Sequence, residues 1–324
     1  MIVPLITVLI AFAVLVWSAD LFVAGAASIA ENAGLSPVII GLTIVSLGTS
    51  APEILVSITA ALAGSGGLAI GNAVGSNIAN IWLVLGITVL VAPIQVYPGC
   101  MRSEMPTLLA VTAGAGLLLI DVELERMDAL LMLSALFLIM GRMIHSQVAE
   151  ADPAAGLDDD ELPHLGPTKA ALAFAAGLVL LIASSRALVW GSSAVASMLG
   201  VSELIIGLTI VAVGTSLPEL AATVASAVRG HAEIAIGNVI GSNMFNLLVV
   251  MAMPGLLAPE QLPENFLLRD YGAMCVATLV FAAAVYAGRG HPRAEAEHGY
   301  LGRGIGLLFC AGYALYYYVL FETT

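Results

Sequence analysis

One block of sequence occurs twice in this chain of 324 residues. The stretch GLSPVIIGLTIVSLGTSAPE at residues 34–53 reappears as GVSELIIGLTIVAVGTSLPE at residues 200–219. Further along, AIGNAVGSNIAN at 69–80 reappears as AIGNVIGSNMFN at 235–246, with the same offset of 166 residues and no gap. Self-similarity at a fixed offset is the signature of a duplication, so the sequence predicts two copies of one folding unit.

The copies lie in a chain that is dominated by apolar residues. Hydrophobic residues make up 60% of the sequence, charged residues make up 10%, and the mean hydropathy is +1.02. This is too little polar surface to cover a soluble globule. The apolar runs are continuous and about 17 to 28 residues long, which suits transmembrane helices and not the alternating strands of a β-barrel. We therefore predict an all-α membrane protein with ten spans, near residues 3–30, 37–63, 68–92, 105–120, 127–145, 169–198, 203–228, 233–257, 270–287 and 300–320.

An odd number of spans separates each motif from its copy. Because five spans lie between them, the second copy enters the membrane from the opposite side, and the repeats are inverted, as in many secondary transporters. We expect a first repeat at 1–145 with its motif at 34–93, an acidic cytoplasmic linker at 146–168, and a second repeat at 169–324 with its motif at 200–259. The positive-inside rule then places both termini outside the cell (inner) membrane, since most basic residues fall on cytoplasmic loops.

The charge balance and the cysteine count exclude several partners. The formal net charge is −13, the opposite sign to that needed for binding nucleic acid. Three scattered cysteines indicate neither a disulfide framework nor a metal-binding motif. We expect no cofactor and no obligatory protein partner, only the lipid bilayer and the ions that the protein transports.

A proline followed by a glutamate interrupts a strongly apolar span in each copy, at Pro52–Glu53 and Pro218–Glu219. Proline lacks an amide hydrogen, so it frees a backbone carbonyl one turn earlier. In hydrocarbon such a break is tolerated only where it faces protein or a polar cavity. A carboxylate at this depth is costly and marks a functional site. We therefore predict that the two glutamates are the charged ligands of an ion.

Polar residues spaced four apart accompany each glutamate and recur in the following span, where they share one helix face. They are Thr49, Glu53, Ser76 and Asn80 in the first repeat, and Thr215, Glu219, Ser242 and Asn246 in the second. All offer oxygen, which favours hard cations such as Ca²⁺ and Na⁺ over Zn²⁺ or Cu²⁺. Ser50 and Ser216 lie beside them and either bind the ion or bond back to their own helix.

The two carboxylates also indicate how transport is coupled. Brought together in a medium of low dielectric constant they repel, so the pair takes up either a cation or a proton. One Ca²⁺ cancels both charges, and several Na⁺ ions could occupy overlapping oxygen positions instead. Mutual exclusion of the two cargoes predicts antiport of Ca²⁺ and Na⁺, with a Ca²⁺/H⁺ antiporter as the alternative.

Two other classes of function fit the sequence less well. A cation channel needs a continuous pore, whereas the symmetry axis of inverted repeats lies in the membrane plane and suits alternating access. An enzyme is not predicted either, because Ser50 and Ser216 have no histidine or lysine at a matching depth to activate them.

Two further charges occupy matched positions within apolar spans, Asp20 in the first span and Arg186 in the sixth. Near the centre of antiparallel neighbours, opposite charges can satisfy each other. We predict a structural salt bridge between them.

The motifs GTSAPE with GNAVGSNIAN, and GTSLPE with GNVIGSNMFN, resemble the two α repeats of the calcium/cation antiporter superfamily, in particular the sodium/calcium exchangers and their prokaryotic relatives. The resemblance implies that kinked spans 2, 3, 7 and 8 surround a central site where Glu53 and Glu219 bind both Ca²⁺ and Na⁺. It implies that Thr49 and Thr215 offer carbonyl or hydroxyl oxygens and that Ser76 and Ser242 complete flanking Na⁺ sites. It also implies that Asn80 lines the centre and that carbonyl groups of Ser46 and Ala212 contribute.

The resemblance also implies that spans 1 and 6 slide as a pair across a rigid core. The small residues that would form a smooth contact face are Gly25, Ser28, Gly191, Ser192 and Ser193. One departure from the family pattern is Asn246, where potassium-dependent exchangers carry an aspartate. The missing acid argues against cotransport of potassium.

Overall fold

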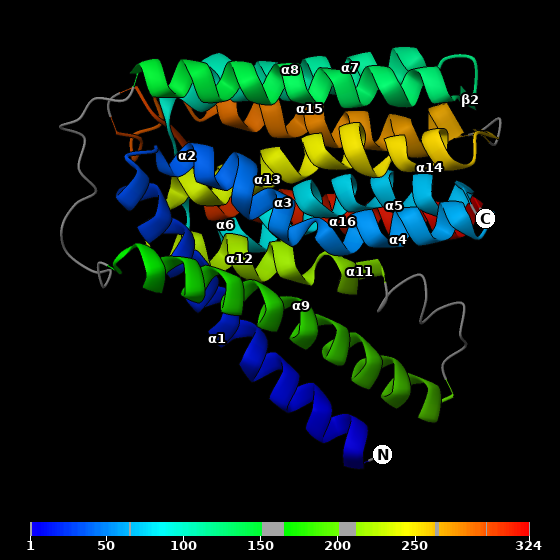
Figure 1. Cartoon of the computed structure of the whole chain (residues 1–324), viewed down its shortest axis with the longest axis horizontal. Helices are drawn as coiled ribbons and strands as arrows, with labels where there is room; N and C mark the ends of the chain where they lie inside the picture. Colours follow the sequence, from blue (N-terminus) through cyan, green and yellow to red (C-terminus); the bar gives the residue numbers. More distant parts are fainter. Residues whose placement is uncertain are drawn as a thin grey trace.

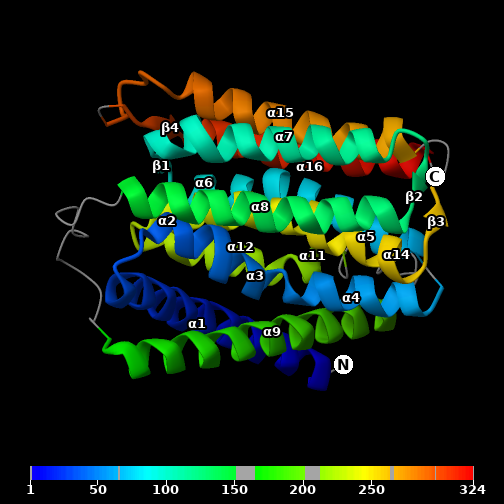
Figure 2. The same cartoon turned by 45° about the horizontal axis from the view of Figure 1, so that its top comes forward.

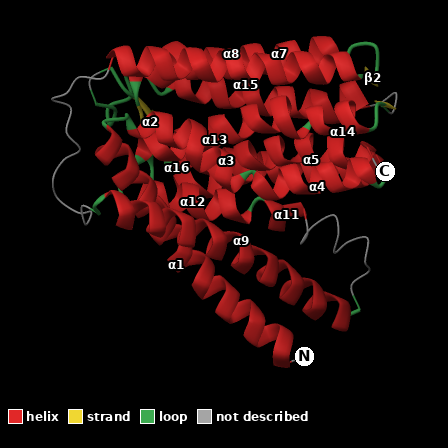
Figure 3. Ribbon diagram, in the orientation of Figure 1, coloured by secondary structure: helices red, strands yellow, loops and turns green. Residues whose placement is uncertain are grey.

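The computed structural model describes residues 2–64, 66–150, 165–200, 212–262, 266–295 and 297–323. This part of the chain is a bundle of helices with two short two-stranded ribbons at its ends (Figure 3). The prediction of an all-α membrane fold is confirmed by this architecture.

The first half of the chain runs through the predicted spans 1 to 5. In the labels below, η marks a π-helical turn, which is a local widening of a helix. The elements are α1 (Ile2–Ala33), α2 (Pro37–Ile40), η1 (Gly41–Val45), α3 (Ser46–Thr49), α4 (Ala51–Leu62), α5 (Gly66–Ala79), η2 (Asn80–Leu85), α6 (Gly86–Val91), β1 (Ile94–Val96), η3 (Cys100–Glu104), α7 (Met105–Leu118), β2 (Glu123–Leu124) and α8 (Arg126–Glu150).

The second half runs through the predicted spans 6 to 10. Its elements are α9 (Pro167–Met198), α11 (Ala212–Thr215), α12 (Leu217–Val228), α13 (Ala232–Phe245), η5 (Asn246–Val250), α14 (Ala252–Leu257), β3 (Glu260–Gln261), η6 (Leu267–Tyr271), α15 (Gly272–Ala287), β4 (Gly299–Leu301) and α16 (Arg303–Thr323). The start of predicted span 7, at 203–211, and most of the predicted linker lie outside the described residues.

Six helices in the described ranges are long and apolar enough to cross a membrane. A seventh is added if the two segments Pro37–Thr49 and Ala51–Leu62, which bend by 44° at Ser50, count as one span. The predicted total of ten remains a prediction, because η3–α7, α8 and α11–α12 do not meet the same length and composition test within those ranges.

Proline and asparagine mark the breaks within the inner helices. Pro52 stands in the first turn of α4, after the bend at Ser50, and Pro218 stands in the first turn of α12, after a turn at Ser216. The π-helical turns η2 and η5 both begin at an asparagine of the repeated motif, Asn80 or Asn246. Spans 2, 3, 7 and 8 are therefore interrupted within the repeated motifs, and such interruptions are frequent at functional sites.

The two ribbons relate the halves of the chain to each other. Strand β1 pairs with β4, with Ile94 opposite Leu301, and β2 pairs with β3, with Glu123 opposite Gln261. Strands β1 and β3 follow the two copies of the motif, yet they lie at opposite ends of the bundle (Figure 2). This is the arrangement expected of inverted copies, and each ribbon ties one half to the other.

Burial separates inner helices from outer ones. In an 18-residue apolar stretch of Ala232–Leu257, 94% of the residues are buried, and in that of Gly66–Val91 the share is 72%. The corresponding shares are 28% for α1, 22% for α9 and 11% for α16. The helices that carry the repeated GN and GSN motifs thus form the centre. The outer helices present apolar side chains, such as Trp17 and Trp190, to the bilayer.

Helices α1 and α9 pack against each other at one side of the bundle (Figure 1). Glycine permits a very close approach, since a Cβ on Gly25 would lie 2.4 Å from the backbone nitrogen of Phe174. A Cβ on Gly177 would lie 2.6 Å from that of Phe22. The helices are antiparallel, and Gly191 likewise faces α1, so these glycines form the contact between α1 and α9 themselves.

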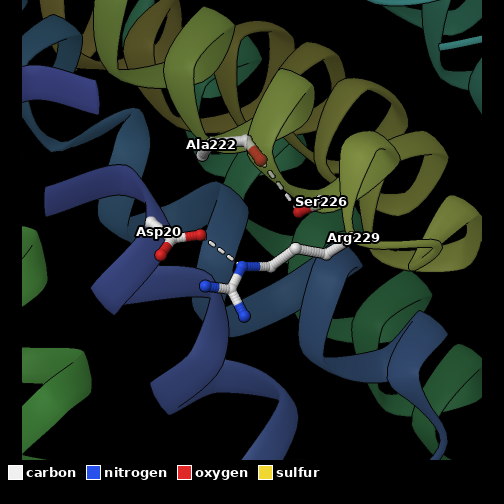
Figure 4. Close-up of polar contacts among 4 residues, drawn as sticks. All are labelled: Asp20, Ala222, Ser226 and Arg229. Atoms are coloured by element: carbon white, nitrogen blue, oxygen red, sulfur yellow. Dashed lines mark hydrogen bonds and ion pairs between the residues drawn. The ribbon is translucent and has the colours of Figure 1, made fainter. Parts of the chain in front are cut away.

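The predicted salt bridge between Asp20 and Arg186 is wrong. Asp20 accepts a hydrogen bond on Oδ1 from Nε of Arg229, at the end of α12 (Figure 4). The register that the glycine contacts impose places Asp20 level with Val179, about 10 Å along α9 from Arg186. Arg186 is exposed. The repeat correctly matched the two positions, but matched positions in inverted copies need not face each other.

Candidate ion-binding site

Glu53 and Glu219 begin the helices that follow the two breaks, α4 and α12. Their exposed fractions are 0% and 1%, and the Glu219 carboxyl group bonds to Ser50, three residues before Glu53, so the two buried carboxyl groups lie in the same part of the interior. Within the described ranges, neither oxygen of Glu53 has a hydrogen-bond partner, and Oε2 of Glu219 has none either. The charged form of a buried carboxyl group without partners is unstable, so this pair requires a bound cation or protonation.

The break in the first copy reaches the glutamate of the second copy. Ser50 Oγ donates a hydrogen bond of 3.3 Å to Oε1 of Glu219. Ser216, the counterpart of Ser50, is buried, and its hydroxyl makes no hydrogen bond to any residue that the structure describes. Neither serine bonds back to its own helix in this part of the chain, so both hydroxyls are available at the site.

Thr49 brings the first copy against α13. Its Oγ1 lies 3.2 Å from Oδ1 of Asn238, 3.3 Å from the carbonyl oxygen of Ser46 and 3.5 Å from Oγ of Ser242. The Ser46 carbonyl also accepts from the amide of Ser50 at 2.9 Å. To bind an ion, this carbonyl would have to give up its contact with the Thr49 hydroxyl.

The asparagines that begin the π-helical turns are buried at the centre, with exposed fractions of 1% for Asn80 and 0% for Asn246. Asn80 Nδ2 donates to Oδ1 of Asn243 at 3.4 Å. Oδ1 of Asn80 and both amide atoms of Asn246 lack partners among the residues described. Ser76 and Ser242, one turn earlier, are buried as well.

Two other predicted residues belong to the second copy. Ala212 and Thr215 form the ends of the short helix α11, which precedes Ser216 and Glu219. The backbone here is tied to α9, because Ser185 Oγ donates to the carbonyl oxygen of Gly214 at 2.9 Å. Their position beside Glu219 matches that of Ser46 and Thr49 beside Glu53 in the sequence.

Three asparagines at the centre were not among the predicted ligands. Asn243 bonds to Asn80, Asn77 donates to Sδ of Met274 at 3.3 Å, and Asn238 bonds to Thr49. All three are at most 2% exposed. The signal was present in the repeated GN and GSN motifs, but spacing along one helix does not reveal which neighbouring helix a side chain meets.

No group of three or more His, Cys, Asp or Glu side chains that could hold a metal ion occurs in the described ranges. The candidate site instead combines two carboxylates with neutral hydroxyl, carboxamide and carbonyl oxygens. Hard cations bind to such oxygen sets, and few charges allow the ion to leave again.

The family model described as "Sodium/calcium exchanger protein" matches residues 3–144 and 169–322. The putative antiporter CaxA of Alkalimonas amylolytica is 46% identical over 282 residues, 86% of this chain and 88% of that protein. The inner membrane protein YrbG of Escherichia coli (strain K12) is 36% identical over 312 residues, 94% of this chain and 93% of that protein. A solved structure of the sodium-calcium exchanger NCX_Mj is 28% identical, with a TM-score of 0.82 over 98% of this chain and 99% of that chain.

Proposed function

Because this chain belongs to the sodium/calcium exchanger family, we propose that it is a secondary active antiporter that exchanges Ca²⁺ for Na⁺ by alternating access. The superfamily resemblance is thereby confirmed. The family consists of transporters, so the prediction that the chain is not an enzyme is confirmed as well. The proposal depends on one observation: Glu53 and Glu219, one from each half, are buried on either side of the contact between Ser50 and Glu219, with three of their four carboxyl oxygens unpartnered in the described ranges.

The electrostatics of this pair explain the exchange. Two buried carboxylates repel each other strongly where the dielectric constant is low. One Ca²⁺ neutralises both, whereas Na⁺ ions must be bound in greater number and spread over more oxygens. Thr49, Ser50 and Ser242 lie in contact with each other or with Glu219, and supply such oxygens. The two cargoes then compete for the same ligands, which couples their movements.

The proposed ligand set extends to both copies. Glu53 and Glu219 provide the charge, and neutral oxygens surround them. The neutral residues are Ser46, Thr49, Ser50, Ser76 and Asn80 from the first half, and Ala212, Thr215, Ser216, Ser242 and Asn246 from the second. Ser46 and Ala212 would contribute through their carbonyl groups.

Sodium is favoured over protons as the driving ion by the neutral ligands. A proton needs only the carboxylates, whereas a dehydrated Na⁺ needs several hydroxyl, amide or carbonyl oxygens. NCX_Mj, which matches this fold over nearly its whole length, is described as a sodium-calcium exchanger. A Ca²⁺/H⁺ antiporter remains the second candidate, because the two buried carboxylates could be neutralised by protons instead.

The protein is an integral multi-pass membrane protein, and we place it in the inner membrane with both termini outside. The relative YrbG is an inner membrane protein. The orientation is supported by the basic residues, which cluster on the loops assigned to the cytoplasm. In this topology the halves 1–145 and 169–324 are joined by a cytoplasmic linker at 146–168.

Ion gradients imposed on proteoliposomes test the driving ion. With Na⁺ inside and Na⁺-free buffer outside, we expect ⁴⁵Ca²⁺ to accumulate above its equilibrium level, because the outward movement of Na⁺ is coupled to Ca²⁺ entry. A pH gradient with equal Na⁺ on both sides should produce no accumulation above the equilibrium level. Accumulation driven by the pH gradient alone would support the Ca²⁺/H⁺ alternative. In the Na⁺-loaded liposomes, Ca²⁺ equilibration without accumulation would indicate a channel.

A further inference from the structure

Asn238 connects the two halves of the site through both ends of its amide. It lies on α13 with an exposed fraction of 0%. Its Oδ1 accepts from Oγ1 of Thr49 at 3.2 Å, and its Nδ2 donates to Oγ1 of Thr223 at 2.8 Å. Thr49 belongs to the first half, and Thr223 lies one turn after Glu219 on α12.

The chemistry of a hydroxyl ligand indicates what the contact between Asn238 and Thr49 does. A threonine hydroxyl has one proton and two lone pairs. To bind a cation it must present a lone pair, and its proton must point elsewhere. Without Asn238, the other acceptors for this proton are the carbonyl oxygen of Ser46, 3.3 Å from Thr49 Oγ1, and the carboxylates, and donation to any of them would occupy an oxygen that the ion needs. We propose that Asn238 is a positioning residue, which takes the proton of Thr49 and leaves a lone pair directed at the ion; this inference rests on the proposed function.

Thr223 determines which end of the amide faces Thr49. An asparagine can present either its oxygen or its NH₂ group to a neighbour. Because Thr223 accepts from Nδ2, the oxygen is turned toward Thr49. The repeat-related residue Asn72 is only partly buried and donates to the backbone carbonyl of Glu53 at 3.3 Å. The two halves therefore hold their corresponding asparagines differently in this conformation.

Kinetics of ⁴⁵Ca²⁺ uptake in proteoliposomes test the role. For Asn238→Ala we expect KM for Ca²⁺ to rise about 10-fold with kcat little changed, because the lost contact affects ion binding. Thr223→Val should raise KM by a smaller factor, since the amide is no longer oriented, whereas Thr223→Ser keeps the hydroxyl and should restore the native KM. Ser226→Ala is the matched control, because the Ser226 hydroxyl donates to the carbonyl of Ala222 on its own helix, at 2.8 Å.

A double-mutant cycle separates positioning from general structural damage. In a Thr49→Val background the hydroxyl is absent, so Asn238→Ala should add no further rise in KM. An unchanged KM in Asn238→Ala and Thr223→Val, or an equal additional rise in the Thr49→Val background, would overturn the positioning role while leaving the proposed function intact. A wild-type protein that does not transport Ca²⁺ would overturn the proposed function itself.

A different observation concerns the ion pair between Asp20 and Arg229 (Figure 4). It joins α1, which packs on α9, to the end of α12, the helix that begins beside Glu219. The two side chains are 47% and 26% exposed. The pair thus connects the outer helix pair α1–α9 to an inner helix of the site.

The pair is asymmetric with respect to the repeat. The residues that correspond to Asp20 and Arg229 are Arg186 and Ala63, at the same offset of 166 residues, and these cannot form an ion pair. Inverted repeats produce two access states by exchanging the conformations of the two halves. In the exchanged state the ion pair would be broken and not replaced. We infer that Asp20 and Arg229 favour the conformation seen here over the exchanged one.

The ratio of apparent Ca²⁺ affinities at the two membrane faces, measured in vesicles of uniform orientation, tests this bias. Asp20→Asn and Arg229→Gln should shift the ratio about 3-fold in the same direction, since partly exposed ion pairs contribute modestly. The exchange Asp20→Arg with Arg229→Asp should restore it. The mirrored pair, Arg186→Asp with Ala63→Arg, should shift it in the opposite direction. Two results in actively transporting protein would refute this bias and leave the proposed function intact. One is an unchanged ratio in both single variants. The other is a mirrored pair that shifts the ratio in the same direction as the single variants do.

Discussion

Glutamine in place of Glu53 is expected to abolish Ca²⁺ uptake, with at least about a 100-fold loss of apparent affinity. Glutamine keeps the size of the side chain and removes its charge. Leaving one member of a buried charge cluster unpaired costs about 3–5 kcal/mol, and about 1.4 kcal/mol corresponds to each tenfold change in affinity. One Ca²⁺ would then face a single carboxylate, Glu219, in a buried site. Glu219→Gln should have the same effect, because the two residues occupy corresponding places.

A charge control distinguishes loss of the site from loss of acidity in general. Asp152→Asn removes one negative charge from the acidic linker and should leave uptake unchanged. Thermal unfolding gives a second readout, since Ca²⁺ that binds only the folded protein should raise the Tm of the wild type and not that of either glutamine variant. Normal uptake by Glu53→Gln or Glu219→Gln would refute the assignment of these ligands.

Much of the fold could be predicted from the sequence, because the length of an apolar run and the position of a proline restrict where a helix begins, breaks and ends. Predicted span 3 at 68–92 corresponds to Gly66–Val91, and predicted span 8 at 233–257 corresponds to Ala232–Leu257. The ends agree because the apolar run and its flanking glycines fix where a helix can leave the bilayer. The breaks at Ser50 and Ser216 were predictable for the same kind of reason, since a proline inside hydrocarbon leaves few alternatives.

What the sequence did not reveal is how helices from different halves face each other. The partner of Asp20 depends on the register between α1 and α9, which is set by the close contacts of Gly25 and Gly177. No periodicity within either helix encodes that register. The role of Asn238 was hidden for the same reason, because Thr49 lies far from it in the sequence and meets it only through tertiary packing.

The candidate site could be predicted from the sequence only in part. Its charged residues were identifiable, because a glutamate beside a proline in an apolar span has no ordinary structural use. The cross-repeat contact of Ser50 with Glu219 was not, since spacing alone left open whether Ser50 bonds back to its own helix. Local physics thus selects the residues, and packing between the halves assigns their partners.

Packing between the halves leads to the second strong prediction, which concerns Gly241 on α13. A Cβ at this position would lie 2.3 Å from Oγ of Ser46 and 2.5 Å from the carbonyl oxygen of Leu42. The backbone atom cannot move aside as a flexible side chain can. Gly241→Val must therefore push α13 away from η1 and α3, which separates Ser242 from Thr49.

We expect Gly241→Val to reduce Ca²⁺ uptake to below about a tenth of the native rate and to lower the Tm, because overpacking costs about 1–3 kcal/mol or more. Gly114→Val is the matched control: Gly114 lies on α7, and a Cβ added there would have no described atom within 4 Å. The control carries the same loss of helix flexibility without the clash. Native uptake and a native Tm in Gly241→Val would contradict the prediction that the site requires close packing of α13 against the first half.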